Sequence, residues 1–301
     1  MSNDDYKQGR LNDLNVLCDS LKKTEELRSV LDDPWRKRVE LAIGRDEGFS
    51  SSAFYLFDIL SSYPGGGAIS MSPADLEERL VRLRDRAVQQ NKKALYRDTR
   101  QKLGAPQENQ VLGALFEIIV LSDLLGALQT VELYPPTDSR KAKSNVDARA
   151  KIEDRWVYLE VKALGYSKYD LKGKSGVGSI ESMKRQVTIA LQSKLGEGGQ
   201  LATLAQHHPT VLALALGFFA GIDSATGAID DDDFRTEATQ NVSCIFVAES
   251  AFVNKGMKPF PNTQSLFQLT CGELAFFKRV LRSDQHAKYR TKLKGNGRGN
   301  V

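Results

Sequence analysis

Two short segments of alternating polar and apolar side chains, residues 145–152 and 155–163, constrain the fold more than any other part of the chain. Strict alternation places successive side chains on opposite faces of a β-strand. The two residues between the segments, Glu153 and Asp154, fit a two-residue turn. We therefore predict an antiparallel hairpin with one apolar face turned toward a core.

The length of the turn fixes the register of this hairpin. A two-residue turn pairs Ile152 with Arg155, and a shift by one residue would turn one apolar face to solvent. In this register the apolar side chains of the two strands share one face, and the pairs are Val146 with Val161, Ala148 with Leu159, and Ala150 with Val157. The polar side chains then share the other face.

The predicted register places Asp147 directly opposite Glu160, and Lys162 projects from the same face. Directly opposed residues have Cβ atoms roughly 4.5–5.5 Å apart. Two carboxylates at that separation repel each other unless a cation lies between them. Because oxygen atoms are the ligands that Mg²⁺ prefers, the pattern predicts a divalent metal site beside a lysine.

Glu117 is the only charged residue between Glu108 and Asp123, within a stretch that is apolar nearly all round. Such a stretch predicts a buried helix over 108–128. A buried carboxylate is costly without a partner, so we expect Glu117 to have one. The metal site is a natural candidate for that partner.

These residues resemble the PD-(D/E)XK nuclease superfamily, which has the restriction-endonuclease-like fold. The matching pieces are the helical Gly-Ala-Leu-Phe-Glu at 113–117, Asp147 on a strand, and Glu160-Val161-Lys162 after twelve residues. The helix pattern is most similar to the Mrr-type and Holliday-junction-resolvase-type branches. The resemblance covers about residues 105–195, and one departure is that Val146 stands where the family often has proline.

The resemblance implies an α/β fold (α+β) with a central mixed sheet flanked by helices, and Mg²⁺-dependent hydrolysis of phosphodiester bonds, with Mn²⁺ as a substitute. By that resemblance Asp147 and Glu160 would ligate the metal, Lys162 would orient or activate the attacking water, and Glu117 would support the metal shell. Gln186 is a candidate for the glutamine that some relatives carry on the following helix.

An endonuclease acting on DNA, in microbial restriction or phage defence, is the function that this resemblance favours. Two alternatives stay open. The first is an inactive nuclease-fold module that binds nucleic acid or assembles a complex. The second is a repair or junction-resolving nuclease with the same chemistry.

A loop at 165–178 adds three candidates for contact with nucleic-acid phosphates, Lys168, Lys172 and Lys174. An ordinary solvated loop is the alternative interpretation. The end of this loop, Gly-Lys-Ser, is not a nucleotide-binding P-loop, because Lys168 occupies the position of the first required glycine.

The sequence predicts three parts: a helical region at 1–104, a nuclease-like domain at 105–285 and a flexible basic tail at 286–301. The helical region includes one long helix from a Ser72 cap to about residue 102, and the break at Gly104-Ala105-Pro106 sets the boundary. Beyond the hairpin, the pattern predicts helices at 179–195 and 272–282 and strands at 210–219 and 242–248.

Composition permits this function without requiring it. The net charge of +4 among 301 residues is compatible with binding nucleic acid, and the resemblance favours DNA over RNA as the partner. Three cysteines without metal-ligand spacing indicate reduced thiols. No signal peptide is visible, and the apolar stretch at 211–220 is too short to span a bilayer. We therefore expect a cytoplasmic protein without a membrane partner, and we keep a homodimer through the helical N-terminal region as a hypothesis.

Overall fold

The computed structural model describes residues 2–45, 52–61, 71–137, 145–164, 201–215, 241–248 and 256–282, together with residues 189 and 193. The chain divides into two compact units, Met1–Ile118 and Ile119–Val301. This division lies inside a helix, whereas the boundary predicted at residue 104 marks a change of sequence pattern. That boundary stays a prediction about separable domains.

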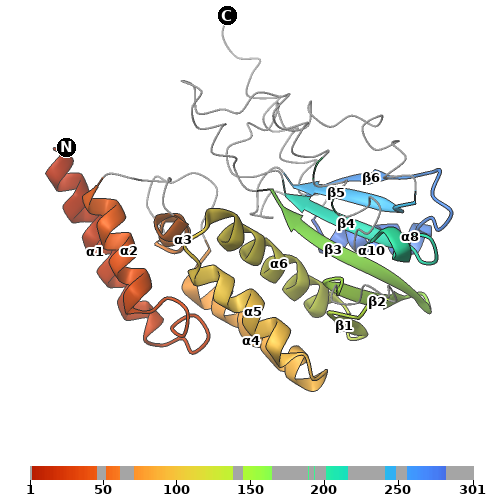
Figure 1. The fold of residues 1–301 in the computed structure, drawn as a ribbon, viewed down its shortest axis with the longest axis horizontal. Helices are drawn as coiled ribbons and strands as arrows, with labels where there is room; N and C mark the ends of the chain where they lie inside the picture. The colour runs from red at the N-terminus through yellow and green to blue at the C-terminus, as the bar shows by residue number, and fades with distance from the viewer. Residues whose placement is uncertain are drawn as a thin grey trace, which may run out of the picture. The chain divides into compact units, whose positions relative to one another are not determined.

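The regular elements described in unit 1 are all helices (Figure 1), as its sequence pattern predicts. Its elements are α1 (Asn3–Leu21), α2 (Asp33–Gly44), α3 (Ser52–Leu60), α4 (Pro73–Gln89), α5 (Lys93–Gln101), the 3-10 turn η2 (Lys102–Gly104) and the first part of α6 (Glu108–Ala127). Side-chain caps begin several of these helices. Ser2 and Asp5 form a capping box at α1, and Asp32 accepts a hydrogen bond from the Trp35 amide at α2.

The prediction of one long helix from Ser72 to residue 102 is wrong in one respect, because the chain turns at Asn91. Ser72 does cap α4, with its hydroxyl accepting from the Asp75 amide. Asn91 adopts a left-handed conformation with φ of 56°. The amides of Asn91 and Lys92 donate back to the carbonyls of Val88 and Ala87, which is the Schellman pattern that ends a helix.

Unit 2 contains a six-stranded mixed sheet in the order β1-β2-β3-β4-β5-β6 (Figure 1). The strands are β1 (Val131–Leu133), β2 (Ala148–Ile152), β3 (Arg155–Ala163), β4 (Thr210–Ala215), β5 (Cys244–Ala248) and β6 (Lys258–Pro261). The three central strands β3, β4 and β5 are parallel, and the outer strands pair antiparallel to their neighbours. Every residue of β4 and β5 is buried, as expected for parallel strands that are covered on both faces.

The hairpin of β2 and β3 has the predicted register. Ile152 pairs with Arg155, and the pairing continues without a slip to Ala148 and Leu159. Both turn residues, Glu153 and Asp154, have positive φ, of 48° and 65°. Such a turn matches the twist of the flanking strands, and it explains why two residues suffice to close the hairpin.

The first strand of this hairpin is shorter than predicted, because regular pairing ends at Ala148. Asp147 lies at a bend just before β2, and Val146 packs in a cluster with Tyr158 and Leu212. The prediction that Val146 continues the apolar face of Ala148 is therefore wrong. At this bend the Asp147 side chain, rather than a backbone carbonyl of β2, accepts the hydrogen bond of the Val161 amide.

Both faces of β3 are covered, although the alternation predicts only one buried face. Phe246 of β5 packs on Phe277 of α10 (Cys271–Val280), with ring centroids 6.2 Å apart, on the face that carries Val161. Leu204 of α8 (Ala202–Ala205) joins the cluster of Tyr158 on the opposite face. The short strands β1 and β6 and helix α8 have too few residues to show a periodic sequence signal, and sequence analysis missed them.

The predicted strands at 210–219 and 242–248 correspond to β4 and β5, and the predicted helix at 272–282 corresponds to α10. The predicted loop at 165–178, the tail at 286–301 and nearly all of the helix at 179–195 lie outside the described residues.

Helix α6 is the one helix in the described residues that is long and apolar enough to cross a membrane by length and composition. Most of its apolar window, Gln110–Ala127, is buried inside the protein. A core helix shows the same properties, as the sequence predicts for this segment.

Candidate metal-binding site on strand β3

Asp147 is held against β3 by its side chain. Its Oδ2 atom accepts a hydrogen bond of 2.7 Å from the backbone amide of Val161, and its carbonyl accepts one of 2.9 Å from the amide of Tyr134. Val161 is the residue between Glu160 and Lys162. The carboxylate of Asp147 therefore lies against the Glu-Val-Lys segment, which confirms that the hairpin brings these two parts of the predicted set together.

Glu160 is 2% exposed, and its Oε2 atom is fully buried. It lies in register with Leu212 of β4, while Lys162 lies in register with Leu214 and is half-buried. The residues of β4 in register with this pair are thus apolar. An ionised carboxylate in such surroundings, next to a second carboxylate, is stabilised strongly by a cation.

Glu117 belongs to unit 1 and is half-buried in α6. Its Oε1 atom accepts a hydrogen bond of 2.9 Å from the hydroxyl of Thr99, which is 5% exposed. The expectation that this carboxylate has a partner is confirmed, and that partner is a hydroxyl of α5. A position near Asp147 and Glu160, which belong to unit 2, stays a prediction.

A second polar group occupies the same strands nearer the hairpin turn. Arg149 forms an ion pair with Glu132 of β1, donates to the hydroxyl of Tyr158, and stacks over the ring of Trp156 with its guanidinium carbon 4.5 Å from the centroid. Burial opposes the charge of Arg149, but the bonds to Tyr158 and Glu132 outweigh burial and raise the pKa of the guanidinium. The ring of His208 lies against Tyr158 at 4.9 Å.

The sequence pattern did not predict that Arg149 and Glu132 form an ion pair beside the site, because Glu132 lies on β1, a strand that the pattern did not reveal. The alternation did place Arg149 on the polar face of its strand. A cross-strand pair of opposite charge could have been proposed only after β1 was recognised beside β2.

The donor set on β3 suits a hard cation. Within the described part of the chain, no three His, Cys, Asp or Glu side chains form a group that could hold a metal ion. Mg²⁺ is commonly held by only one or two carboxylates, with water and substrate phosphates as its other ligands. Asp147 and Glu160 supply two carboxylates without sulfur or nitrogen ligands, which fits Mg²⁺ better than zinc.

Four other predicted contact residues cannot be placed. Lys168, Lys172, Lys174 and Gln186 all lie outside the described residues. Their contribution to nucleic-acid binding stays a prediction.

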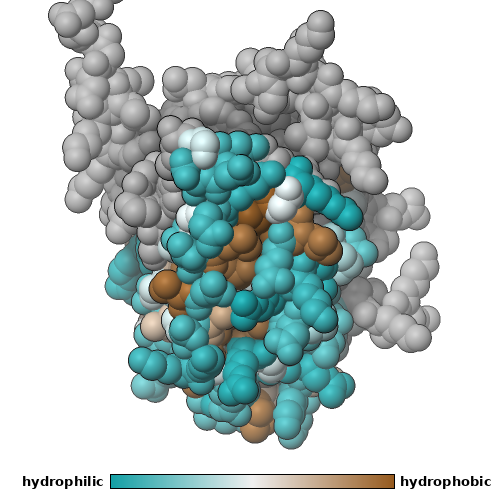
Figure 2. Space-filling view, turned by 90° about the vertical axis from the view of Figure 1, so that its left-hand side faces the viewer, coloured by the Kyte–Doolittle hydropathy of each residue, from teal (hydrophilic) through white to brown (hydrophobic). Residues whose placement is uncertain are grey.

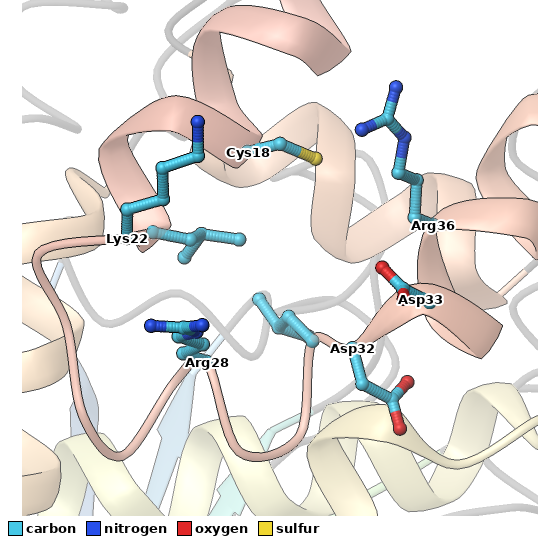
Figure 3. Close-up of a pocket in the computed structure, with 8 residues that line it drawn as sticks. Cys18, Lys22, Arg28, Asp32, Asp33 and Arg36 are labelled. Carbon is cyan, nitrogen blue, oxygen red and sulfur yellow. The ribbon is translucent and has the colours of Figure 1, made fainter.

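A separate pocket of about 330 Å³ lies in unit 1, between the end of α1 and the start of α2 (Figure 3). Its walls combine apolar, basic and acidic side chains: Cys18, Leu21, Lys22, Arg28, Leu31, Asp32, Asp33 and Arg36. Two of its cations are already paired within unit 1, Lys22 with Asp19 and Arg36 with Glu40. Burial raises the pKa of the Cys18 thiol, so this cysteine is a poor nucleophile at neutral pH.

The side of the protein that carries α1 and α2 shows apolar patches among mostly hydrophilic side chains (Figure 2). Val16 of α1 and Leu41 of α2 are among the exposed large hydrophobic residues, at 70% and 55%. Exposed apolar side chains of this kind are common on protein surfaces. The hypothesis of a homodimer through the helical region stays a prediction.

Taken together, fold and site define a mixed α/β protein whose six-stranded sheet carries two carboxylates and a lysine at the junction of an antiparallel and a parallel strand pair. In comparisons with known proteins, no family model, no curated protein and no solved structure matches the chain.

Proposed function

We propose that this chain is a metal-dependent nuclease with a restriction-endonuclease-like core, which hydrolyses phosphodiester bonds in DNA. The observation that supports it most is the hydrogen bond from the Val161 amide to the Asp147 carboxylate. That bond gathers Asp147, Glu160 and Lys162 around one stretch of backbone. A role in restriction or phage defence rests only on the sequence resemblance.

Asp147 and Glu160 are the residues that would hold Mg²⁺ in this proposal. When bound, the metal would neutralise the charge of the phosphodiester and lower the pKa of a water molecule. The hydrogen bond from the Val161 amide holds the Asp147 carboxylate in a fixed orientation against β3. The buried position of Glu160 limits access of bulk water, which strengthens electrostatic interactions there.

Lys162 would act on the substrate through its charge. A lysine ammonium is a compact positive charge with three hydrogen-bond donors. Beside Glu160 on β3 and the Asp147 carboxylate bound to the same segment, it can donate to an anionic phosphate oxygen or orient the attacking water. Glu117 would support the metal shell if it lies near these residues.

The decisive experiment incubates the purified protein with single- and double-stranded DNA and RNA, in Mg²⁺, Mn²⁺ or EDTA. We expect cleavage of DNA that EDTA abolishes. Lys162→Met and Glu160→Gln should each lower the cleavage rate by at least about a hundredfold, because each removes a charge that the reaction needs. Lys151→Met is the matched control, since this lysine lies on the same hairpin but pairs with Asp154 at the turn.

Wild-type cleavage by the Glu160→Gln protein, or cleavage that persists in EDTA, would contradict the proposed site. If the wild-type protein binds DNA and Mg²⁺ but cuts no substrate, the alternative of a nuclease-fold binding module replaces this proposal.

A further inference from the structure

The helices α4 and α5, which lie side by side in unit 1 (Figure 1), carry nine basic residues between Arg79 and Lys102. The structure separates these residues into two groups. Five of them have partners: Arg79, Arg82, Arg84, Arg100 and Lys102. Arg84 and Arg100, for example, both bind the buried carboxylate of Glu26. The charges of these five residues are therefore used in interactions that stabilise the protein.

The other four are Arg86, Lys92, Lys93 and Arg97, which we call the α4–α5 basic patch. In the part of the chain that the structure describes, their side chains form no ion pair or hydrogen bond. Lys93 and Arg97 are exposed and stand one helical turn apart, on the same side of α5. No acidic residue occurs anywhere in 86–97.

The start of α5 adds to the positive character of this patch. Lys92 is the N-cap residue, and no side chain caps the helix there. The first amides of an uncapped helix have no intrahelical acceptor, and the helix dipole places a partial positive charge at the same end. The left-handed turn at Asn91 brings this helix end beside the end of α4, where Arg86 lies.

From this sorting of charges we infer that the α4–α5 basic patch binds the phosphate backbone of nucleic acid. The inference rests on the proposed function, and it assigns unit 1 the task of holding the substrate of the site on β3. Several cations without acidic partners, together with free amide donors, match a run of anionic phosphate oxygens. Contacts of this kind hold any sequence equally, because phosphates carry no sequence information.

A membrane surface fits the patch less well. Helices that bind membranes place an apolar face into the lipid. The apolar face of α4, formed by Leu76, Leu80 and Leu83, is fully buried within the protein. Val88 is the only large apolar residue of the patch region that is strongly exposed, at 50%.

The test compares two charge-matched double variants of the full chain. Lys93→Gln/Arg97→Gln removes two charges from the patch, and Lys23→Gln/Lys37→Gln removes two exposed charges elsewhere in unit 1. Glutamine keeps a good helix propensity, so both variants should fold. Binding of fluorescein-labelled duplex DNA is followed by anisotropy in EDTA, where metal-dependent cleavage cannot occur, at several salt concentrations.

We expect the patch variant to bind roughly tenfold more weakly at about 0.1 M salt, with a log–log salt slope flatter by roughly 0.9 for each lost phosphate contact. The control variant should retain the wild-type slope. A Lys93→Arg/Arg97→Lys protein, which keeps both charges, should also retain the wild-type slope. It controls for an effect of substitution at these positions on folding.

An unchanged slope in the patch variant, or an equal change in both variants, would overturn the inference. So would loss of binding to phosphatidylserine vesicles with DNA binding intact, which would make the patch a membrane contact. These outcomes are independent of the proposed chemistry, because cleavage by the wild-type and Lys162→Met proteins tests the site on β3 separately.

Discussion

Asp147 combines a structural and a chemical contribution, and substitution can separate them. Asparagine keeps an oxygen that accepts the hydrogen bond from Val161 but removes the negative charge. We expect Asp147→Asn to unfold at nearly the wild-type urea concentration and to lose metal-dependent cleavage. Asp147→Ala should in addition lower the free energy of unfolding by about 1–3 kcal/mol, because the Val161 amide loses its acceptor.

Equal stability of the alanine and asparagine variants would show that the hydrogen bond contributes nothing measurable. Urea titrations followed by circular dichroism provide the comparison.

Glu26 gives unit 1 a defined sensitivity to acid. Burial alone would raise the pKa of this carboxyl, but hydrogen bonds from Arg100, Tyr96 and Arg84 outweigh burial and lower the pKa below its ordinary value of 4.5. A carboxyl whose pKa is lower in the folded protein than in the unfolded chain stabilises the fold at every pH above its unfolded-state pKa. This stabilisation is lost as the pH falls through the folded-state pKa. We expect the free energy of unfolding to decline below about pH 4.5 for this reason.

The Glu26→Gln protein tests this origin. It should be less stable at pH 7 by about 1–3 kcal/mol, because Arg84 and Arg100 lose their charged acceptor. The gap to wild type should narrow as the pH falls below 4.5. A gap that stays constant down to pH 3 would mean that Glu26 does not titrate with unfolding.

Among the elements, the β2–β3 hairpin is joined to the start of α10 by an ion pair between the partly exposed Arg155 and the buried Glu273. Both guanidinium arms of Arg155 donate to Glu273, at 2.8 and 2.5 Å, and Glu273 is fully buried. Glu153 accepts a hydrogen bond from the hydroxyl of Thr270, the cap of the same helix. The hairpin that carries the candidate site is therefore held at its turn as well as along its strands.

Breaking the ion pair between Arg155 and Glu273 should destabilise the protein. Arg155→Ala removes both hydrogen bonds to the buried carboxylate of Glu273, which should cost about 1–3 kcal/mol because Arg155 itself is partly exposed. Arg155→Lys should recover only part of the lost stability, since lysine cannot make the bidentate hydrogen bonds to the Glu273 carboxylate. Thermal unfolding measures the loss, and Lys151→Ala, which removes an exposed pair on the same hairpin, should change stability by less than about 1 kcal/mol.

The turn between α4 and α5 depends on one left-handed residue. Asn91 tolerates a φ of 56° better than most residues, and glycine tolerates it without strain. Asn91→Gly should therefore leave stability unchanged or slightly higher, while Asn91→Val should cost about 1–2 kcal/mol. Equal melting temperatures for the two variants would show that the left-handed turn is not required. If the basic patch binds DNA, the valine variant should also weaken that binding.

At the level of the whole molecule, the two units share helix α6. The buried residues of its first part, among them Leu112, Leu115 and Phe116, belong to unit 1, and the division follows Ile118. A chain that begins at residue 105 loses the rest of unit 1 and exposes this apolar surface. We expect such a fragment to bind the dye ANS and to elute as aggregates, whereas the full chain does neither. A monodisperse fragment with wild-type stability would instead support separable domains at residue 104.

The linker around Gly104 is itself tied into unit 1. Arg38 donates a hydrogen bond of 2.7 Å to the Gly104 carbonyl, and a Cβ atom at Gly104 would lie 2.7 Å from the Val30 carbonyl oxygen. The glycine is needed because two backbone segments approach closely there. The sequence pattern alone predicts a domain break at this glycine, because glycine occurs both in flexible linkers and where two backbone segments approach closely.

The sequence by itself determined the hairpin and its register. Alternation over two segments and a two-residue turn leave only one register with a consistent apolar face over Ala148–Ile152, and this register brings Asp147 beside the segment 160–162. The apolar length of α6 and the cap at Ser72 were likewise local signals. The part of the candidate site that comprises Asp147, Glu160 and Lys162 is thus a short-range feature, formed within sixteen residues of chain.

Only the tertiary structure decided what covers the second face of β3, how Asp147 is held, and which cations are free. Tyr158, for example, is buried in a cluster with residues from β4, β5 and α8, which are far away in sequence. Arg84 and Arg100 look like Lys93 and Arg97 in the sequence and differ only because Glu26 lies beside the first two. Long-range packing sets the dielectric surroundings and the partner of each charge, and a local pattern of residue types contains neither.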